Sequence, residues 1–195
     1  MKRLICALLL FMTLGHAAQD EEVEEVETWL GLEVVEEAYV CDTDDERYSS
    51  RDYTYGSGAD VAMRERFDGY YSPYENIWYE KATDVDIEHI VARNEAHQSG
   101  LCKASKLVRY EFANDLLNLT MAHKDINRNQ KSDNDPGEWL PPNNECWYVW
   151  QVRLVKLKYN LSIDSQERDE MKRVLESCTV DEIFLDPPEQ DGSRP

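Results

Sequence analysis

A set of four cysteines behind an N-terminal export signal constrains this fold more than any other feature. Residues 1–17 combine two basic residues, an apolar run and small residues, which is the three-part pattern of a cleaved signal peptide. Cleavage removes the first of five cysteines and leaves Cys41, Cys102, Cys146 and Cys178 in the mature chain. An even number of cysteines in a secreted or periplasmic chain predicts two disulfides, whose pairing the sequence leaves open. No CxxC pair occurs, so a zinc–thiolate site is disfavoured.

The length and the local composition suggest how the chain is divided. The 195 residues suit one domain, and no apolar run is long enough for a membrane helix, so we expect no membrane anchor after signal removal. Two prolines and a glycine near the C-terminus predict a disordered tail. We therefore expect a signal peptide (1–17), an acidic N-terminal arm (18–40), one folded domain (41–180) and a disordered tail (181–195).

The acidity of the chain is unevenly distributed. Its formal net charge of −19 taken alone disfavours a polyanionic partner such as nucleic acid. Residues 20–46 carry 13 acidic and no basic residues, however, whereas residues 86–160 carry 10 of each sign. The central region therefore remains compatible with a polyanion. We expect a solvated arm, with a weak amphipathic helix over residues 19–37 as the alternative.

The hydrophobic pattern predicts an α+β arrangement. Alternation of Ile and Val with polar residues favours strands, and helical spacing with N-terminal capping at Asp164 favours helices. The polar stretch from Lys124 is predicted to be helical in its first half, and residues 41–58 to form turns and short strands. We expect strands over residues 83–91 and 116–121, and helices over residues 103–114, 145–161 and about 165–178.

Two polar stretches contain residue types suited to a cation site. The first predicted strand carries Glu88 next to His89, and Asn127 follows in the polar stretch after the second strand. Carboxylate and amide oxygens suit a hard cation such as Mg²⁺, and a histidine that is not a ligand is free to act as a base. Neighbouring residues of a regular strand point to opposite faces, so Glu88 and His89 converge only if the strand ends or bulges there.

These stretches resemble a known family. The motifs are DIEHIVARNEAHQSG (residues 86–100), FANDLLNLT (residues 112–120) and NRNQKSDNDPGEWLPP (residues 127–142). In this order they are similar to the secreted HNH nucleases of the ββα-metal type, which are related to the HNH domain of the GmrSD restriction enzymes. The resemblance implies a single α+β domain built around a ββα-metal (HNH) core with additional helices, braced here by disulfides.

The resemblance also implies roles for individual residues. His89 is expected to be the general base, Glu88 and Asn127 to bind one Mg²⁺ or Mn²⁺ ion, and Asn118 to brace the metal site through hydrogen bonds. Glu88 stands where many relatives have Asp, and Ala92 where many have Pro. Asn127 and Lys131 lie four residues apart where many relatives have three, which leaves Asn129 as an alternative ligand.

The remaining site residues are charged. Arg93, Arg128 and Lys131 flank the metal residues and are expected to contact phosphates. Asp86 is expected to orient His89 or bind a metal-bound water, with solvation of the strand end as the alternative. The implied function is an exported, metal-dependent endonuclease that hydrolyses phosphodiester bonds of nucleic acid, with DNA favoured over RNA and no protein partner. The alternative is an exported, non-catalytic binding protein on a degenerate HNH fold.

Overall fold

A computed structural model describes residues 26–36, 41, 47–56 and 58–189. The predicted signal peptide, most of the acidic arm and residues 190–195 of the predicted tail lie outside the described residues. The described residues form one α+β domain, which confirms the predicted fold class. No helix in this part of the chain is long and apolar enough to cross a membrane.

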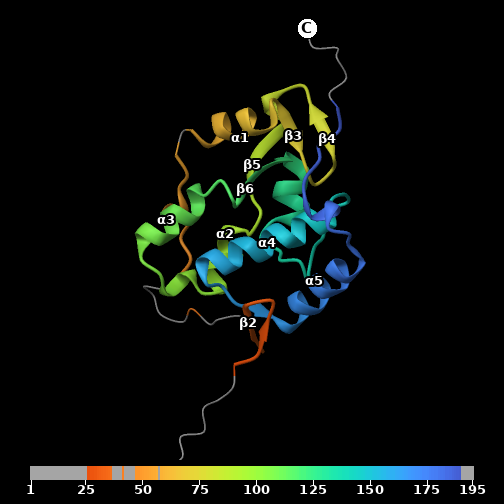
Figure 1. Cartoon of the computed structure of the whole chain (residues 1–195). Coiled ribbons are helices and arrows are strands. Elements are labelled where there is room, and N and C mark those ends of the chain that lie inside the picture. Colours follow the sequence, from red (N-terminus) through yellow and green to blue (C-terminus); the bar gives the residue numbers. More distant parts are fainter. Residues whose placement is uncertain (1–25, 37–40, 42–46, 57, 190–195) are drawn as a thin grey trace, which may run out of the picture.

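An antiparallel pair of strands lies at the centre of the molecule (Figure 1). Strand β5 (Val85–His89) pairs with β6 (Leu119–His123), so that Glu88 lies opposite Thr120. The π-helix η5 (Ile126–Lys131) follows β6 directly, which gives the order strand, strand, helix. A π-helix is wound more widely than an α-helix and accommodates one extra residue per turn. The four-residue spacing from Asn127 to Lys131 lies in this segment.

The second predicted strand begins later than expected because a turn occupies its first residues. The backbone N–H of Asn118 donates to the carbonyl oxygen of Asp115 (2.8 Å), and the Asp115 carboxylate accepts from the N–H of Leu117 (3.1 Å). Aspartate favours such turns because its side chain binds the backbone two residues ahead. Strand β6 therefore begins at Leu119.

One face of the strand pair packs against a small layer of elements that the sequence analysis did not predict. Helix α1 (Ala59–Phe67) and the hairpin of β3 (Tyr70–Ser72) and β4 (Ile77–Tyr79) lie beside the strand pair in Figure 1. Met63, which is fully buried, packs there with alternate residues of the two strands. Because side chains alternate across a strand, Asp86 and Glu88 belong to the other face, which is the face toward η5.

The larger core lies among the helices on the other side of the strand pair. Its largest buried side chains include Phe112, Trp147 and Tyr148. The three predicted helices are confirmed, with small shifts at their ends. The last begins where predicted, because the Asp164 carboxylate caps it by accepting from the N–H of Glu167 (2.8 Å). The three are α3 (Lys106–Asn114), α4 (Glu145–Tyr159) and α5 (Ser165–Ser177), and a further helix, α2 (Arg93–Gln98), was not predicted.

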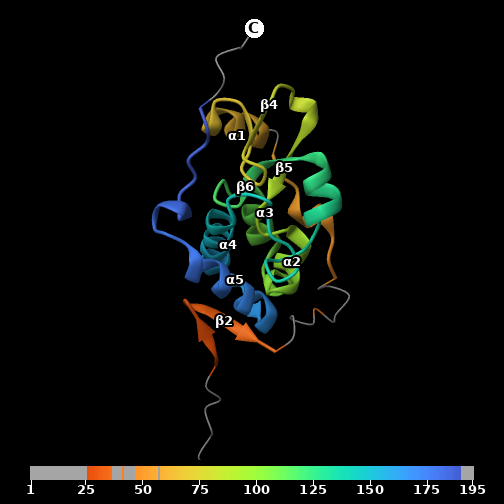
Figure 2. The same ribbon diagram turned by 90° about the vertical axis from the view of Figure 1, so that its right-hand side faces the viewer.

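Part of the acidic arm belongs to the folded domain, contrary to both expectations for it. Strands β1 (Thr28–Trp29) and β2 (Leu32–Val35) form a hairpin, and β2 pairs in parallel with β7 (Ile163–Asp164) next to α5 (Figure 2). The hairpin is possible because Leu30 and Gly31 both adopt positive φ angles, as a tight two-residue turn requires. Leu32 is 2% exposed and joins the core. The predictions of a solvated arm and of an amphipathic helix are therefore both wrong for residues 26–36.

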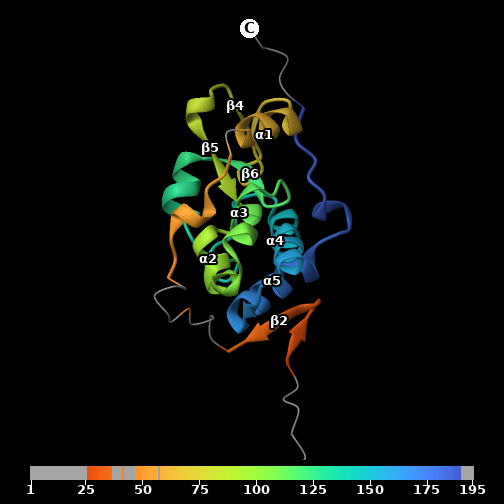
Figure 3. The same cartoon turned by 90° about the vertical axis from the view of Figure 1, so that its left-hand side faces the viewer.

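The first part of the predicted tail is also ordered. A short 3₁₀ turn, η6 (Asp181–Ile183), follows α5, and the chain then runs along the side of the molecule toward the β3–β4 hairpin (Figure 3). Leu185 packs against the core, and the indole N–H of Trp78 donates to the carbonyl oxygen of Pro188 (2.8 Å). The prediction of disorder is therefore wrong for residues 181–189.

Two disulfides are present, as the cysteine count predicts. Cys41 pairs with Cys102, and Cys146 pairs with Cys178. The second bridge links the start of α4 to the end of α5, and the first links Cys41 to the loop after α2. The structure thus supplies the pairing that the sequence left open.

Candidate active site

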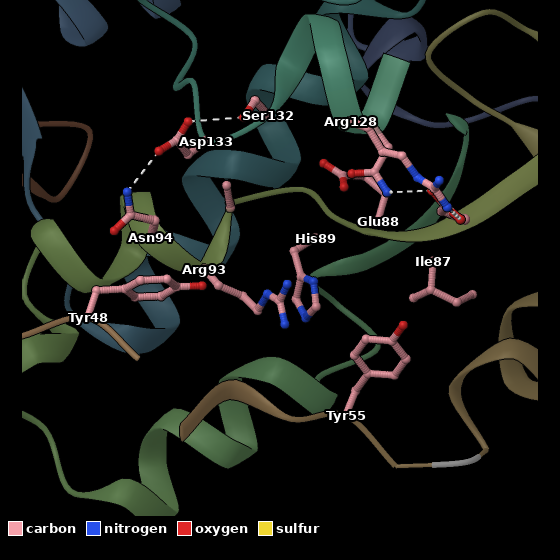
Figure 4. A pocket seen from close by; sticks show the side chains of 13 residues that line it. Tyr48, Tyr55, Ile87, Glu88, His89, Arg93, Asn94, Arg128, Ser132 and Asp133 are labelled. Carbon is pink, nitrogen blue, oxygen red and sulfur yellow. Dashed lines mark hydrogen bonds and ion pairs between the residues drawn. The ribbon is translucent and has the colours of Figure 1, made fainter. Parts of the chain in front are cut away.

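A cleft of about 590 Å³ runs beside strand β5 and contains most of the predicted site residues (Figure 4). We call it the β5 cleft. Its lining includes the predicted residues Asp86, Glu88, His89, Arg93, Asn127 and Arg128. Asn118 and Lys131 do not line it and lie behind its wall.

His89 is held as a neutral imidazole of one tautomer. In a regular strand, His89 and Glu88 would point to opposite faces. His89 is the last residue of β5, however, and both side chains line the cleft. The His89 Nε2 lies 2.9 Å from the carbonyl oxygen of Ala113, and a carbonyl only accepts, so Nε2 carries the hydrogen. Nδ1 of the neutral ring is then an acceptor. Burial lowers the pKa of His89 to about 3, so the ring is neutral at physiological pH.

Glu88 forms an ion pair below the cleft. Its Oε1 lies 2.9 Å from the Lys131 ammonium, which also donates to the carbonyl oxygen of His89 (3.1 Å). Burial raises the pKa of Glu88 above its ordinary value, and Lys131 opposes this effect. The predicted phosphate contact of Lys131 is therefore wrong in this structure. The Lys131 side chain is fully buried beside Glu88, since a carboxylate removed from water requires a compensating charge.

Asp86 is bound by two residues of η5. Arg128 donates to it through Nε (2.7 Å) and Nη2 (2.8 Å), and the Asn127 amide donates to Oδ2 (3.4 Å). The Arg128 side chain remains 60% exposed at the rim of the cleft. The contacts of Asp86 are thus with Arg128 and Asn127, and not with His89 as one expectation for it required.

Asn118 fixes the backbone that follows His89. Its side chain is fully buried, with Oδ1 accepting from the N–H of Val91 (2.8 Å) and Nδ2 donating to the Val91 carbonyl (3.2 Å). The Asn118 carbonyl also accepts from the N–H of Ile90 (2.8 Å). These bonds hold the chain in place at the point where β5 ends.

Several cleft residues were missed by the sequence analysis. Tyr48 and Tyr55 come from the polar segment before α1, and Asn94 donates from α2 to Asp133 (2.8 Å). The two tyrosines gave only a weak signal, since they are aromatic residues in a stretch predicted to form turns. Figure 4 shows Tyr55 across from His89 and Ile87, on the wall opposite Arg128.

The donor chemistry of the cleft fits a hard cation with few protein ligands. Within the described residues, no three His, Cys, Asp or Glu side chains are grouped as a metal site. Asp86 and Glu88, however, lie two residues apart on one face of β5, and Asn127 reaches Asp86 from η5. All three side chains carry oxygen donors, and Mg²⁺ commonly takes one or two carboxylates and keeps several waters.

The similarities to known proteins agree with this geometry. Residues 42–174 match the family of GmrSD restriction endonucleases, C-terminal domain, and the chain belongs to this family. A protein of Arthroderma benhamiae, named as an uncharacterized secreted protein, is 35% identical over 112 residues, which cover 56% of this chain. The match spans about half (55%) of that relative's length. No solved structure matches the chain. The predicted family is confirmed, and the predicted export agrees with the name of this relative.

Proposed function

We propose that this protein is an exported, metal-dependent nuclease that hydrolyses phosphodiester bonds of nucleic acid, with DNA favoured over RNA. The observation that carries the proposal is the neutral His89, fixed in one tautomer, in a cleft that also contains Asp86, Glu88 and Asn127. Membership of a restriction-endonuclease domain family supports the same reaction class.

His89 acts as the general base in this proposal. Its Nδ1 takes a proton from the water that attacks phosphorus, and its Nε2–H stays bonded to the Ala113 carbonyl. That bond fixes the ring and stabilises the positive charge that forms as the proton arrives. Asn118 supports the base indirectly, because it fixes Val91 two residues further along the chain.

Glu88 and Asn127, with Asp86 beside them, would hold the divalent cation, Mg²⁺ or Mn²⁺. When bound, such a cation polarises a phosphoryl oxygen and stabilises the charge on the leaving oxygen. Arg128, exposed at the rim, and Arg93 are placed to contact neighbouring phosphates. Lys131 is positioned to keep Glu88 ionised rather than to touch substrate.

The test separates the base from the metal ligands. We expect His89→Gly to lower cleavage of single-stranded and plasmid DNA by about 10²- to 10⁴-fold without changing the Mg²⁺ concentration needed for half-maximal rate. Added imidazole should restore part of the rate, because it can accept the proton in the space left by the ring. Glu88→Ala and Asn127→Ala should instead raise the Mg²⁺ requirement. His123→Gly, outside the cleft, is the matched control and should cleave like the parent.

Three results would contradict the proposal. Full activity in excess EDTA would exclude the cation, and a raised Mg²⁺ requirement in His89→Gly would make this residue a ligand. If the folded parent binds DNA but cleaves neither form with Mg²⁺ or Mn²⁺, the protein is a non-catalytic binding protein on this fold.

A further inference from the structure

An exposed aromatic ring lies inside the β5 cleft, next to the proposed base. Tyr55 is 47% exposed, and its ring centroid lies 6.0 Å from that of His89. Tyrosine rings usually bury their faces in the core or at an interface. Tyr55 leaves much of its surface open to the space in which a substrate must lie.

The backbone around Tyr55 is fixed on both sides. The Asn114 side chain, at the end of α3, donates to the carbonyl oxygen of Thr54 (3.1 Å) and accepts from the N–H of Gly56 (2.7 Å). One amide group therefore holds the residue before and the residue after Tyr55. A ring on a fixed backbone loses little conformational entropy when a ligand stacks on it.

A second, smaller pocket borders the same strand, β5. It has a volume of about 190 Å³ and shares Asp86 and Ile87 with the β5 cleft. Val61 and Arg64 from α1 and Tyr70 from β3 contribute to its lining. We call it the side pocket. Its lining combines apolar and aromatic residues, which suit a flat ring, with the carboxylates of Asp60 and Asp86 and with the Arg64 guanidinium, which suits a phosphate.

The charges around the cleft argue against a duplex as the preferred ligand. Binding to double-stranded DNA depends on neutralising many phosphates, whereas residues 86–160 carry equal numbers of acidic and basic residues. Two cations near the cleft are already paired, Arg128 with Asp86 and Lys131 with Glu88. Stacking of bases on aromatic rings provides affinity without a net positive charge. It requires an unpaired base, because the base faces in a duplex are covered by their neighbours.

We propose that the cleft binds single-stranded nucleic acid, with one base stacked on Tyr55 and a neighbouring base in the side pocket, on either side of the reacting phosphate. The proposal rests on the proposed nuclease function and specifies its substrate. Tyr55 is then a specificity-determining residue that contacts the substrate without taking part in proton transfer.

The first experiment compares substrates and ring chemistry. A DNA oligonucleotide should be cleaved about 10-fold or more faster alone than when annealed to its complement, given the strength of one stacked base. Tyr55→Leu should lower kcat/KM for the single strand about 5- to 150-fold, mainly through KM. Tyr55→Phe and Tyr55→Trp should retain activity because they keep a ring. Tyr110→Leu is the matched control, since Tyr110 is 46% exposed but does not line the cleft.

The second experiment separates a failure of this proposal from a failure of the nuclease function. Hydrolysis of bis(p-nitrophenyl) phosphate by the parent protein needs no nucleobase, so it reports the nuclease chemistry independently of the nucleic-acid substrate. Binding of the single strand is measured without cleavage, in EDTA, with 2-aminopurine as the reporter base. Parent protein should quench its fluorescence by stacking, and Tyr55→Leu should not.

Substrates that lack one base test where the two bound bases lie relative to the cleaved bond. An abasic residue on either side of the cleaved bond should slow cleavage, whereas abasic residues further away should have little effect. Equal cleavage of duplex and single strand, or equal oligonucleotide binding by parent and Tyr55→Leu, would overturn the proposal. Either result would leave diester hydrolysis by the parent intact as evidence for the nuclease.

Discussion

Two fully buried lysines with glutamate partners lie in different parts of this molecule and have different surroundings. Lys156, on α4, binds Glu167 (2.6 Å), Glu95 (2.7 Å) and the Ser162 carbonyl (3.1 Å). Lys131, on η5, binds the carboxylate of Glu88 and one carbonyl. The first lysine uses three acceptors for its three hydrogens and joins α4 to α2, α5 and the β7 segment. The second joins only η5 to β5.

The difference shows how the same residue pair serves structure in one place and chemistry in another. Burial alone would lower the pKa of Lys156, but Glu167 and Glu95 outweigh it and raise the pKa. This lysine is therefore charged in the folded protein, and its partners have no access to the cleft. Glu88 lines the cleft, so its charge can be balanced by Lys131 alone or by Lys131 together with a cation.

The largest expected effect on stability is at Lys156 and its partners Glu95 and Glu167, which we call the interior centre. Lys156→Met leaves the buried carboxylate of Glu167 and the partly buried carboxylate of Glu95 without their cation, and we expect it to lower the free energy of unfolding by about 3–5 kcal/mol. Lys158→Met, two residues along the same helix, is the matched control. Lys158 pairs with Asp115 at 2.6 Å but its side chain is 51% exposed, so its removal should cost about 1 kcal/mol or less. Urea unfolding in EDTA measures both, and equal losses would refute the structural role of Lys156.

A smaller and cation-dependent effect is expected at the cleft. Lys131→Met should lower the free energy of unfolding in EDTA by about 1–3 kcal/mol, less than at Lys156 because Glu88 can take up a proton beside the cleft. Excess Mg²⁺ should restore part of this loss by binding the folded state. The same Mg²⁺ should leave Lys156→Met unchanged relative to the parent. The measurement is thermal unfolding of both variants with and without Mg²⁺. Equal stabilisation of Lys131→Met and Lys156→Met by Mg²⁺ would show that the two lysine sites do not differ in cation binding.

Local patterns explain which parts of this fold were predictable. The alternation through His89 predicted β5, the capping spacing at Asp164 predicted the start of α5, and the cysteine count predicted two bridges. Each of these signals acts over a few residues or depends only on composition. The β1–β2 hairpin was missed because acidic residues dominate its segment, and the burial of Leu32 depends on contacts with distant helices.

The candidate site was predictable in its residue types but not in its pairings. The motif located Glu88, His89 and Asn127, all of which line one cleft. It could not tell that Arg128 lies at the rim while Lys131, three residues later, is buried against Glu88. That distinction depends on the winding of η5. Tyr55 was missed because nothing in its own segment shows that it lies beside His89.

The smallest expected effect tests whether the interior centre responds to pH. Burial raises the pKa of Asp135, which lies near Lys156 and Glu95, to about 6. The unfolded state has an ordinary aspartate pKa of about 4, so the folded state holds the proton more tightly. The charged carboxylate therefore destabilises the fold above about pH 6, and this cost disappears as the pH falls from about 6 to about 4.

Asp135→Asn removes the charge and keeps the oxygen that accepts from the N–H of Gly137 (2.6 Å). We expect it to raise the free energy of unfolding by about 1–2 kcal/mol near pH 8, after allowance for the partial exposure of Asp135. The gain should shrink as the pH falls and be absent near pH 4.

Asp133→Asn is the control of opposite sign, because a hydrogen bond from Asn94 lowers the pKa of Asp133. Its ionised form stabilises the fold, so this variant should show no gain at high pH. A gain in Asp135→Asn that does not change with pH would mean that its charge is not the cause, and the pH response would then not belong to the Lys156 centre.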